Sequence, residues 1–355
     1  MNILILSASI GAGHTRAALA LQKVLPAAQV VDFTARDVST LNWLMKKIYL
    51  AALRLIPDLY DRLYKLADGR RAGVTTRFAT SALMYLPFAR LLKKFSPDVI
   101  ICTHPFPEAA ASLWKFLHAK KPNFLLATVL TDYSLHEIWI YSEVDAYFVA
   151  TEEMRRQLAP HCRAGQKIFA TGIPIDSAFQ SLQRTNSNVT RILIMGGGLG
   201  LGSIEETLAE LNHITLPLNI VVVAGKNETL LARLKNFHSN HRVDLRGFVE
   251  DIPTLMANAD LLITKPGALT LSEAFAAGVP MILHAPIPGP EALNADYAVS
   301  HGAALSVGKQ KLSVIVANLL AEPERLRAMA TASKKLARPC AADDVVEQIK
   351  KFPAT

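Results

Sequence analysis

Residues 2–14 read NILILSASIGAGH, a short apolar run that ends in small residues and glycines. The run Asn2–Ser7 is typical of a strand buried on both faces of a parallel sheet. Residues Thr15–Leu25 follow with apolar side chains at helical spacing, Ala18 and Leu21 among them. This order of strand, glycine turn and helix predicts the first unit of an α/β fold.

The same alternation continues along the chain in two series. We expect two doubly wound, Rossmann-like domains, residues 1–180 and 190–335, joined by the polar segment Ser181–Val189. A helical pattern begins at Leu312, and a helical tail, residues 336–355, could pack back on the first domain. After the first strand, the expected strands are Gln29–Phe33, Asp98–Thr103, Phe124–Thr131 and Ala146–Ala150, then Arg191–Met195, Asn219–Ala224, Val243–Leu245, Leu261–Thr264 and Pro280–Leu283.

The composition excludes several classes of protein. With 355 residues, 51% hydrophobic and 19% charged, the chain is long and apolar enough for two folded cores. Its three cysteines lack Cys-x-x-Cys spacing, which predicts neither a zinc nor a redox site and favours a reducing compartment. No apolar run reaches the roughly 18 residues of a spanning helix, and the first residues do not resemble a signal peptide. We expect a cytoplasmic protein, bound peripherally to the cytoplasmic membrane.

The net charge of +8 is concentrated in one part of the chain. Residues 43–94 hold eleven lysines and arginines against three aspartates, an excess equal to that of the whole chain. Aromatic residues such as Trp43, Tyr85 and Phe88 stand among them. This mixture is typical of a surface that binds anionic lipid; the alternative is a pair of amphipathic helices packed on the core with solvated charges. No nucleic-acid module accompanies the charge, so we expect no nucleic-acid partner.

The turn Gly11–His14 closes the first expected strand and opens the first helix. A helix N-terminus attracts anions, but Arg16 stands where the dinucleotide motif GxGxxG places its third glycine, so that motif is absent. In open parallel sheets ligands bind beyond the carboxyl ends of the strands, where His14 would lie. His14 is therefore either a general base that takes a proton from an acceptor hydroxyl or a histidine that caps the helix.

Glycine-containing turns also end the strands of the second series. One loop, Met195–Gly202, reads MGGGLGLG and precedes a helix expected near Ser203. Backbone N–H groups in such a loop can approach a diphosphate, and the aromatic ring in the turn Gly247–Val249 could pack near a base. The residues of these turns that we expect at a nucleotide are Gly197, Gly198, Gly225, Lys226, Phe248 and Val249.

The segment Thr264–Gly278, TKPGALTLSEAFAAG, combines a strand end, a tight turn and a helix start. The helix N-terminus could face a diphosphate, and Glu273 could bind the two hydroxyls of a ribose; the alternative for Glu273 is an acid that caps the helix. Glu291 and Asn294 are three residues apart, on one side of a helix turn, and could hold the hydroxyls of a sugar. The residues expected around the diphosphate are Lys265, Gly267, Ala268, Leu269 and Thr270.

These segments resemble one family of enzymes, the diacylglycerol glycosyltransferases. The family comprises bacterial processive diacylglycerol β-glucosyltransferases and plant monogalactosyldiacylglycerol synthases, and is related to the peptidoglycan lipid-linked N-acetylglucosaminyltransferase. The resemblance covers most of the chain. The segments that carry it are SxxxGAGH at Ser7–His14, LTDYSLHEIWIYSEVDAYFVAT at Leu130–Thr151, TGIPI at Thr171–Ile175, GKN at Gly225–Asn227, GFVEDI at Gly247–Ile252, TKPGALTLSEA at Thr264–Ala274 and PIPGPEALNA at Pro286–Ala295.

The resemblance implies the GT-B fold: two facing Rossmann-like domains, with a lipid acceptor at the first and a UDP-sugar in the second. It implies that a hexose passes from UDP to diacylglycerol or a glycosyl-diacylglycerol with inversion, and that no metal or cofactor takes part, the UDP-sugar being a substrate. It matches His14 and Asp132 to catalytic positions and Glu273 to the acid that binds ribose. The residues that it places at the acceptor are Gly13, His14, His136 and Trp139.

Two positions depart from the family's pattern. Ala268 stands where a second glycine is usual, which adds a methyl group beside the phosphates, and Pro290 replaces a glutamine that can contact the donor sugar. These differences leave the identity of the hexose open. The alternative functions are a transferase to a polyprenyl-linked acceptor, an epimerase that uses a UDP-sugar, and a non-catalytic nucleotide-binding membrane protein.

Overall fold

The computed structural model describes residues 1–35, 40, 43–44, 47, 70–119, 124–185, 190–196, 204–284, 286 and 289–353. The chain divides into two compact units. The first consists mainly of Met1–Ser177 and Cys340–Thr355, and the second mainly of Ala178–Ile287 and Glu291–Pro339. The expected linker, Ser181–Val189, therefore falls within the second unit, and its residues 186–189 lie outside the described ranges.

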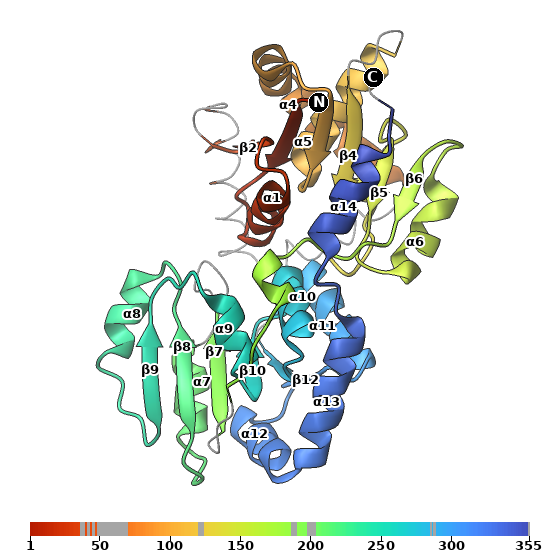
Figure 1. Ribbon diagram of the computed structural model, residues 1–355. Coiled ribbons are helices and arrows are strands. Elements are labelled where there is room, and N and C mark those ends of the chain that lie inside the picture. The colour runs from red at the N-terminus through yellow and green to blue at the C-terminus, as the bar shows by residue number, and fades with distance from the viewer. Residues whose placement is uncertain are drawn as a thin grey trace. The chain divides into compact units, whose positions relative to one another are not determined.

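The first unit is built on a six-stranded parallel sheet in the order β2-β1-β3-β4-β5-β6 (Figure 1). Every residue of β1, β3 and β4 is buried, as is usual when a parallel sheet is covered on both faces. Ile5 pairs with Val30 on one side and with Ile101 on the other, which sets the register of the three strands around β1. The strands are β1 (Ile3–Ser7), β2 (Gln29–Asp32), β3 (Val99–Cys102), β4 (Leu125–Val129), β5 (Ala146–Phe148) and β6 (Lys167–Phe169).

One helix of the first unit comes from the far end of the chain. Val345, Val346 and Ile349 of α14 are buried in the same hydrophobic cluster as Ile5 of β1 and Leu21 of α1. This helix is therefore part of the core of the first unit (Figure 1). The helices of the unit are α1 (Gly13–Val24), α4 (Arg70–Phe95), α5 (Pro105–Leu117), α6 (Glu152–Leu158) and α14 (Ala341–Lys350), with short 3₁₀ turns η1 (Glu137–Trp139) and η2 (Ala159–His161).

The second unit repeats the plan with a six-stranded parallel sheet in the order β12-β11-β10-β7-β8-β9. Leu193 of β7 pairs with Val221 of β8 and Leu262 of β10, so β7, like β1, is the strand from which its sheet extends in both directions. Edge strand β9 alternates exposed and half-buried residues, as suits a strand with one free side. The strands are β7 (Arg191–Met195), β8 (Asn219–Val223), β9 (Arg242–Arg246), β10 (Leu261–Thr264), β11 (Met281–Leu283) and β12 (Ala304–Ser306).

The helices of the second unit begin and end at recognisable residues. Asn227 and Asp251 cap α8 and α9 through their side chains, and Gly278 ends α10 in the left-handed conformation with φ +67°. The pattern expected as helical from Leu312 onward forms two helices, because Pro323 starts a new one. The helices are α7 (Ile204–Leu211), α8 (Glu228–Leu234), α9 (Ile252–Ala257), α10 (Ala268–Ala277), α11 (Pro290–Ser300), α12 (Leu312–Ala321) and α13 (Pro323–Leu336), preceded by the turn η3 (Ser177–Gln180).

Two observations bear on the membrane. In the described parts of the chain, no helix is long and apolar enough to cross a bilayer. Helix α4 buries Met84 and Phe88, while Leu83 and Leu86 are exposed. Much of the basic stretch 43–94, including residues 48–69, lies outside the described residues. Where it is described, the stretch thus has both a packed face and exposed apolar side chains.

Candidate active site

The first group of candidate residues lies where β1, β3 and β4 end side by side. The chain leaves β1 on one side for β2 and returns on the other for β3, and such a switch point is where open α/β sheets bind ligands. His14, the second residue of α1, has Nδ1 3.0 Å from the carbonyl oxygen of Thr103. The hydroxyl oxygen of Thr131 lies 2.6 Å from the same nitrogen.

The contact with Thr103 indicates the tautomer of His14, in which the Thr131 hydroxyl oxygen faces Nδ1 as an acceptor. A carbonyl oxygen can only accept, so Nδ1 carries the hydrogen and donates it to Thr103. In the neutral ring, Nε2 then has the free lone pair of a base. Helix α1 has Ala12 at its N-cap position and no side chain that caps it. The alternative in which His14 caps the helix is therefore wrong.

The electrostatic surroundings of His14 work in two directions. Burial lowers its pKa below the ordinary value of 6.5, while the negative charge of Asp132 and the hydrogen bond to Thr103 raise it. The net pKa is lowered, so the imidazole is neutral at neutral pH. Asp132 in turn would stabilise the imidazolium formed when the ring takes a proton.

The other residues expected at the acceptor lie in the same unit. The ring centroid of Trp139 is 6.5 Å from that of His14. His136 is buried, and its Nδ1 accepts a hydrogen bond from the backbone N–H of Ile138, so this side chain caps the turn η1. Gly13 is the first residue of α1. Of these residues, Trp139 makes a ring contact with His14.

Sequence reasoning missed three neighbours of His14. Thr103 and Thr131 contact its Nδ1, and the ring of His104 lies edge-on to it with centroids 4.6 Å apart. Only their position in the fold could have indicated them. Thr103 and His104 follow β3, which pairs with β1, and Thr131 follows β4, the next strand in the sheet.

The second group of candidate residues surrounds the N-terminus of α10, after β10. Lys265 and Glu291 form an ion pair there, with 17% and 13% of their side chains exposed. A Cβ atom placed on Gly267 would lie 3.8 Å from Nζ of Lys265 and 3.9 Å from Oε1 of Glu291. The bare backbone of Gly267 thus faces a cation and a carboxylate. Ala268, Leu269 and Thr270 form the first turn of α10, whose N–H groups favour an anion.

Glu273 lies in the second turn of α10 and is 1% exposed. It is too far into the helix to cap it, and Gly267 holds the N-cap position without a side chain, so the capping alternative is wrong. Asn294 is fully buried in α11, one turn after Glu291. A buried carboxylate and a buried amide in these places are the polar groups expected at a ligand site.

Turns after β8 and β9 also approach each other. Gly225 has φ +61°, a conformation that favours glycine, and a Cβ atom placed on Gly247 would lie 3.9 Å from its carbonyl oxygen. The ammonium group of Lys226 lies 5.2 Å from the ring centroid of Phe248, which is 61% exposed. Val249 follows Phe248 and is half-buried. The glycines expected at the diphosphate, Gly197 and Gly198, lie outside the described residues.

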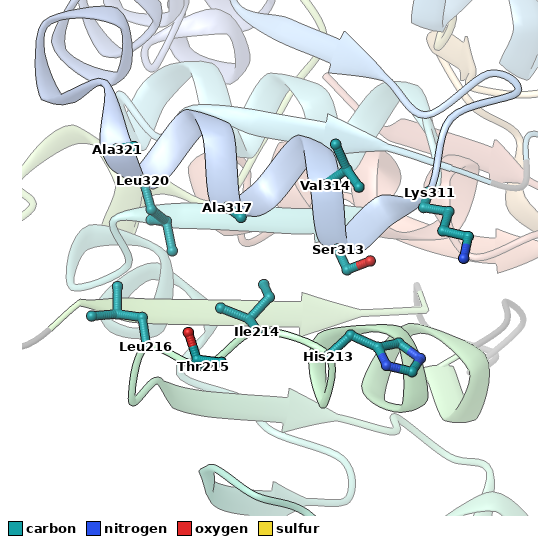
Figure 2. A pocket seen from close by; sticks show the side chains of 10 residues that line it. All are labelled: His213, Ile214, Thr215, Leu216, Lys311, Ser313, Val314, Ala317, Leu320 and Ala321. Atoms are coloured by element: carbon teal, nitrogen blue, oxygen red, sulfur yellow. The ribbon is translucent and has the colours of Figure 1, made fainter.

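Hollows also lie in the described part of the second unit. One of about 470 Å³ opens where β11 and β12 end, lined among others by Glu206, His284 and Lys311. His284 was missed in the sequence, and burial lowers its pKa. A larger hollow of about 630 Å³ lies between α12 and the stretch 213–216 (Figure 2), and none of the expected site residues lines it. Within the described ranges, no three His, Cys, Asp or Glu side chains are grouped to hold a metal ion.

Known proteins resemble both units. The monogalactosyldiacylglycerol (MGDG) synthase family matches residues 14–175, and the C-terminal domain of glycosyltransferase family 28 matches residues 191–345. The processive diacylglycerol beta-glucosyltransferase of Bacillus cereus (strain AH187) is 33% identical over 98% of this chain and 93% of its own length. The Bacillus thuringiensis (strain Al Hakam) protein of that name is equally similar.

This chain belongs to the diacylglycerol glycosyltransferases.

Solved structures agree with the fold of this diacylglycerol glycosyltransferase. Acinetobacter baumannii MurG matches with a TM-score of 0.63 at 20% identity, covering 99% of this chain and all of its own. The glycosyltransferase SnogD from Streptomyces nogalater matches with a TM-score of 0.60 at 17% identity, covering 99% of each chain. The expected GT-B class, with two doubly wound α/β units, is therefore confirmed.

Proposed function

We propose that this diacylglycerol glycosyltransferase moves a hexose from a UDP-sugar to diacylglycerol, or to a glycosyl-diacylglycerol, with inversion. The observation that carries the proposal is the likeness over nearly the whole chain to a protein named for that reaction. The orientation of His14 supports it, because Nε2 is the ring nitrogen free to take a proton. Likeness to MurG is at the level of fold, and so does not favour the polyprenyl-linked acceptor.

In the proposed reaction, the acceptor hydroxyl attacks the first carbon of the hexose. A bond forms between that oxygen and carbon while the bond from the carbon to the diphosphate breaks, and UDP leaves. Nε2 of His14 takes the hydroxyl proton, and the charge of Asp132 stabilises the imidazolium.

The donor is assigned to the second unit. The first turn of α10, together with Lys265, would stabilise the charge that develops on the leaving diphosphate. Glu291 and Asn294 would bind hydroxyls of the hexose, Glu273 the ribose, and Phe248 the base. Among these, Phe248 supports the assignment by its exposure, since a large aromatic side chain in contact with solvent suits stacking on a ligand.

The acceptor lipid implies a membrane surface, and we propose that α4 takes part in binding it. Leu83 and Leu86 are exposed on this helix together with Arg90, Lys93 and Lys94. Exposed leucines can enter the lipid interface while the basic groups attract anionic head groups. The proposed location is the cytoplasmic face of the membrane, with peripheral attachment.

The test is direct product analysis. The purified protein is incubated with labelled UDP-glucose or UDP-galactose and with diacylglycerol or a polyprenyl phosphate in vesicles, and the lipids are separated by thin-layer chromatography. We expect labelled glycosyl-diacylglycerol, with glucose the first sugar to try because of the relatives' name. Product on the polyprenyl lipid alone, or loss of UDP-sugar without any lipid product, would contradict the proposal.

A further inference from the structure

A second imidazole lies beside His14 in the first unit. His104 follows β3 and stands at the N-cap position of α5. Its ring is 5% exposed and meets that of His14 edge-on, with centroids 4.6 Å apart and planes inclined by 76°. The ring of Phe106 packs on it from α5, with centroids 4.7 Å apart.

The backbone fixes the tautomer of His104 as it does that of His14, but in the opposite sense. The backbone N–H of Phe106 donates to Nδ1 of His104 at 3.1 Å. An amide N–H can only donate, so this Nδ1 carries no hydrogen, and in the neutral ring Nε2 does. The two rings thus offer complementary nitrogens, a lone pair on His14 and a hydrogen on His104.

The neutral state of His104 follows from its surroundings. Burial, and repulsion from His14 when that ring is protonated, both lower the pKa of His104 well below the ordinary value. Asp132 is the acid that acts on His14. From α5, the backbone N–H and the ring of Phe106 contact His104. Among the described residues, Nε2 of His104 makes no hydrogen bond, so its hydrogen is available to a ligand.

We propose that His104 is an acceptor-binding residue whose Nε2–H donates to an oxygen next to the attacking hydroxyl, while Nε2 of His14 takes the proton of that hydroxyl. The inference rests on the proposed function. It defines the acceptor class as alcohols with a second oxygen on the neighbouring carbon. Diacylglycerol has an ester oxygen in that place, and glycosyl-diacylglycerol has sugar oxygens there. A simple long-chain alcohol has none.

The experiment compares diacylglycerol with a long-chain monoalcohol in the same mixed micelles. Serine at position 104 can still cap α5 but cannot reach a ligand as a donor. We expect H104S to lower kcat/KM for diacylglycerol by about tenfold, the worth of one hydrogen bond, and to change kcat/KM for the monoalcohol much less. H104N, which keeps both a cap and an N–H donor, should recover part of the preference.

A matched control lies at the other end of the same helix. His118 is exposed and its Nδ1 contacts the carbonyl oxygen of Trp114, and H118N should leave both rates and the acceptor preference unchanged. If H104S lowers kcat/KM by the same factor for both acceptors, or changes neither value, His104 is structural and the proposal is overturned. Should H104S fail to fold, H104T takes its place, because threonine can also cap α5 but has no N–H to donate, and an unaltered ratio of the two kcat/KM values in H104T would overturn the proposal equally.

Failure of the proposed function would give a different experimental result from failure of the role proposed for His104. In that case the wild type would glycosylate neither acceptor, whereas failure of the inference leaves wild-type transfer to diacylglycerol in place. Binding of UDP, measured by calorimetry, should be equal in wild type and H104S, because the donor is assigned to the second unit. A loss of UDP binding in H104S would also count against a role confined to the acceptor.

Discussion

Nδ1 of His14 lies 3.0 Å from the carbonyl oxygen of Thr103, a residue 89 positions further along the chain. The contact joins the start of α1 to the end of β3 and leaves the other ring nitrogen as the proposed base.

Replacing His14 by alanine should remove the base. We expect H14A to lower kcat by a factor of about 10² to 10⁴, the usual contribution of general base catalysis. Affinity for UDP should stay as in the wild type, since the residues proposed to bind the donor belong to the second unit. Steady-state kinetics and calorimetry check this, and retained turnover with unchanged acceptor affinity would remove His14 from catalysis.

The pH dependence should follow the protonation of His14. In the proposed mechanism the neutral ring is the active form, and its pKa is lowered, so kcat/KM should rise with pH through a midpoint below 6.5. Asp132 raises this pKa; D132N should therefore move the midpoint to lower pH, while kcat falls because the imidazolium loses its partner. A midpoint that moves to higher pH in D132N would contradict the role of Asp132 in raising the pKa of His14.

The two glycines at the ends of α10 should respond differently to alanine. Gly267 has φ −68°, and its added methyl would meet only atoms at 3.8 Å or more, so G267A should fold normally but raise KM for the donor. Gly278 has φ +67°, so G278A should lower the free energy of unfolding by about 1 to 2 kcal/mol and leave donor KM alone. Urea unfolding measures the stability of both variants, and steady-state kinetics measure KM for the donor. Together they show which glycine serves donor binding and which serves stability.

Glu108 should make stability depend on pH. It is fully buried, its Oε1 accepts from the Thr128 hydroxyl at 2.9 Å, and burial raises its pKa well above 4.5. The folded state keeps the proton that the unfolded state releases, so stability should fall as pH rises through this window, by about 1.4 kcal/mol per unit. E108Q lacks this titration, and its unfolding free energy relative to wild type should improve from pH 5 to 7. Parallel pH profiles of E108Q and the wild type would contradict this.

Binding to anionic vesicles should depend on α4. Leu86 is 65% exposed on this helix, and L86E both removes an apolar group and adds a repelling charge. We expect weaker sedimentation with vesicles that contain anionic phospholipid, with UDP binding unaltered. Leu216 of the second unit is 51% exposed and serves as the control, since L216E adds the same charge elsewhere. Equal losses in both variants would mean that net charge alone is responsible.

The central strands could be predicted because buried parallel strands are continuous apolar runs. Arg191–Met195 and Leu261–Thr264 form the expected strands without change. The pattern did not reveal β6 or β12, which are three residues long, partly exposed and at the edges of their sheets. A short edge strand depends on its neighbour for pairing, and its own residues carry little of the apolar signal.

The candidate site was predictable where one segment of sequence contains it. The turn before α1 revealed His14, and the segment around Gly267 revealed the helix start at α10. The contacts of His14 with Thr103 and Thr131 depend instead on which strands are neighbours, and alternation alone does not give that order. The assigned roles of the donor and acceptor residues stay predictions until a ligand is bound.

Helix α14 completes the hydrophobic core of the first unit although nearly the whole chain separates it from β1. During synthesis, the half that carries His14 therefore starts to form first but cannot close until Val345 and Ile349 have left the ribosome. The second unit, whose strands all come from one continuous stretch, can fold in the meantime. A chain cut off shortly before residue 341 would thus contain every described strand of both sheets but lack the helix that completes the core of the first unit.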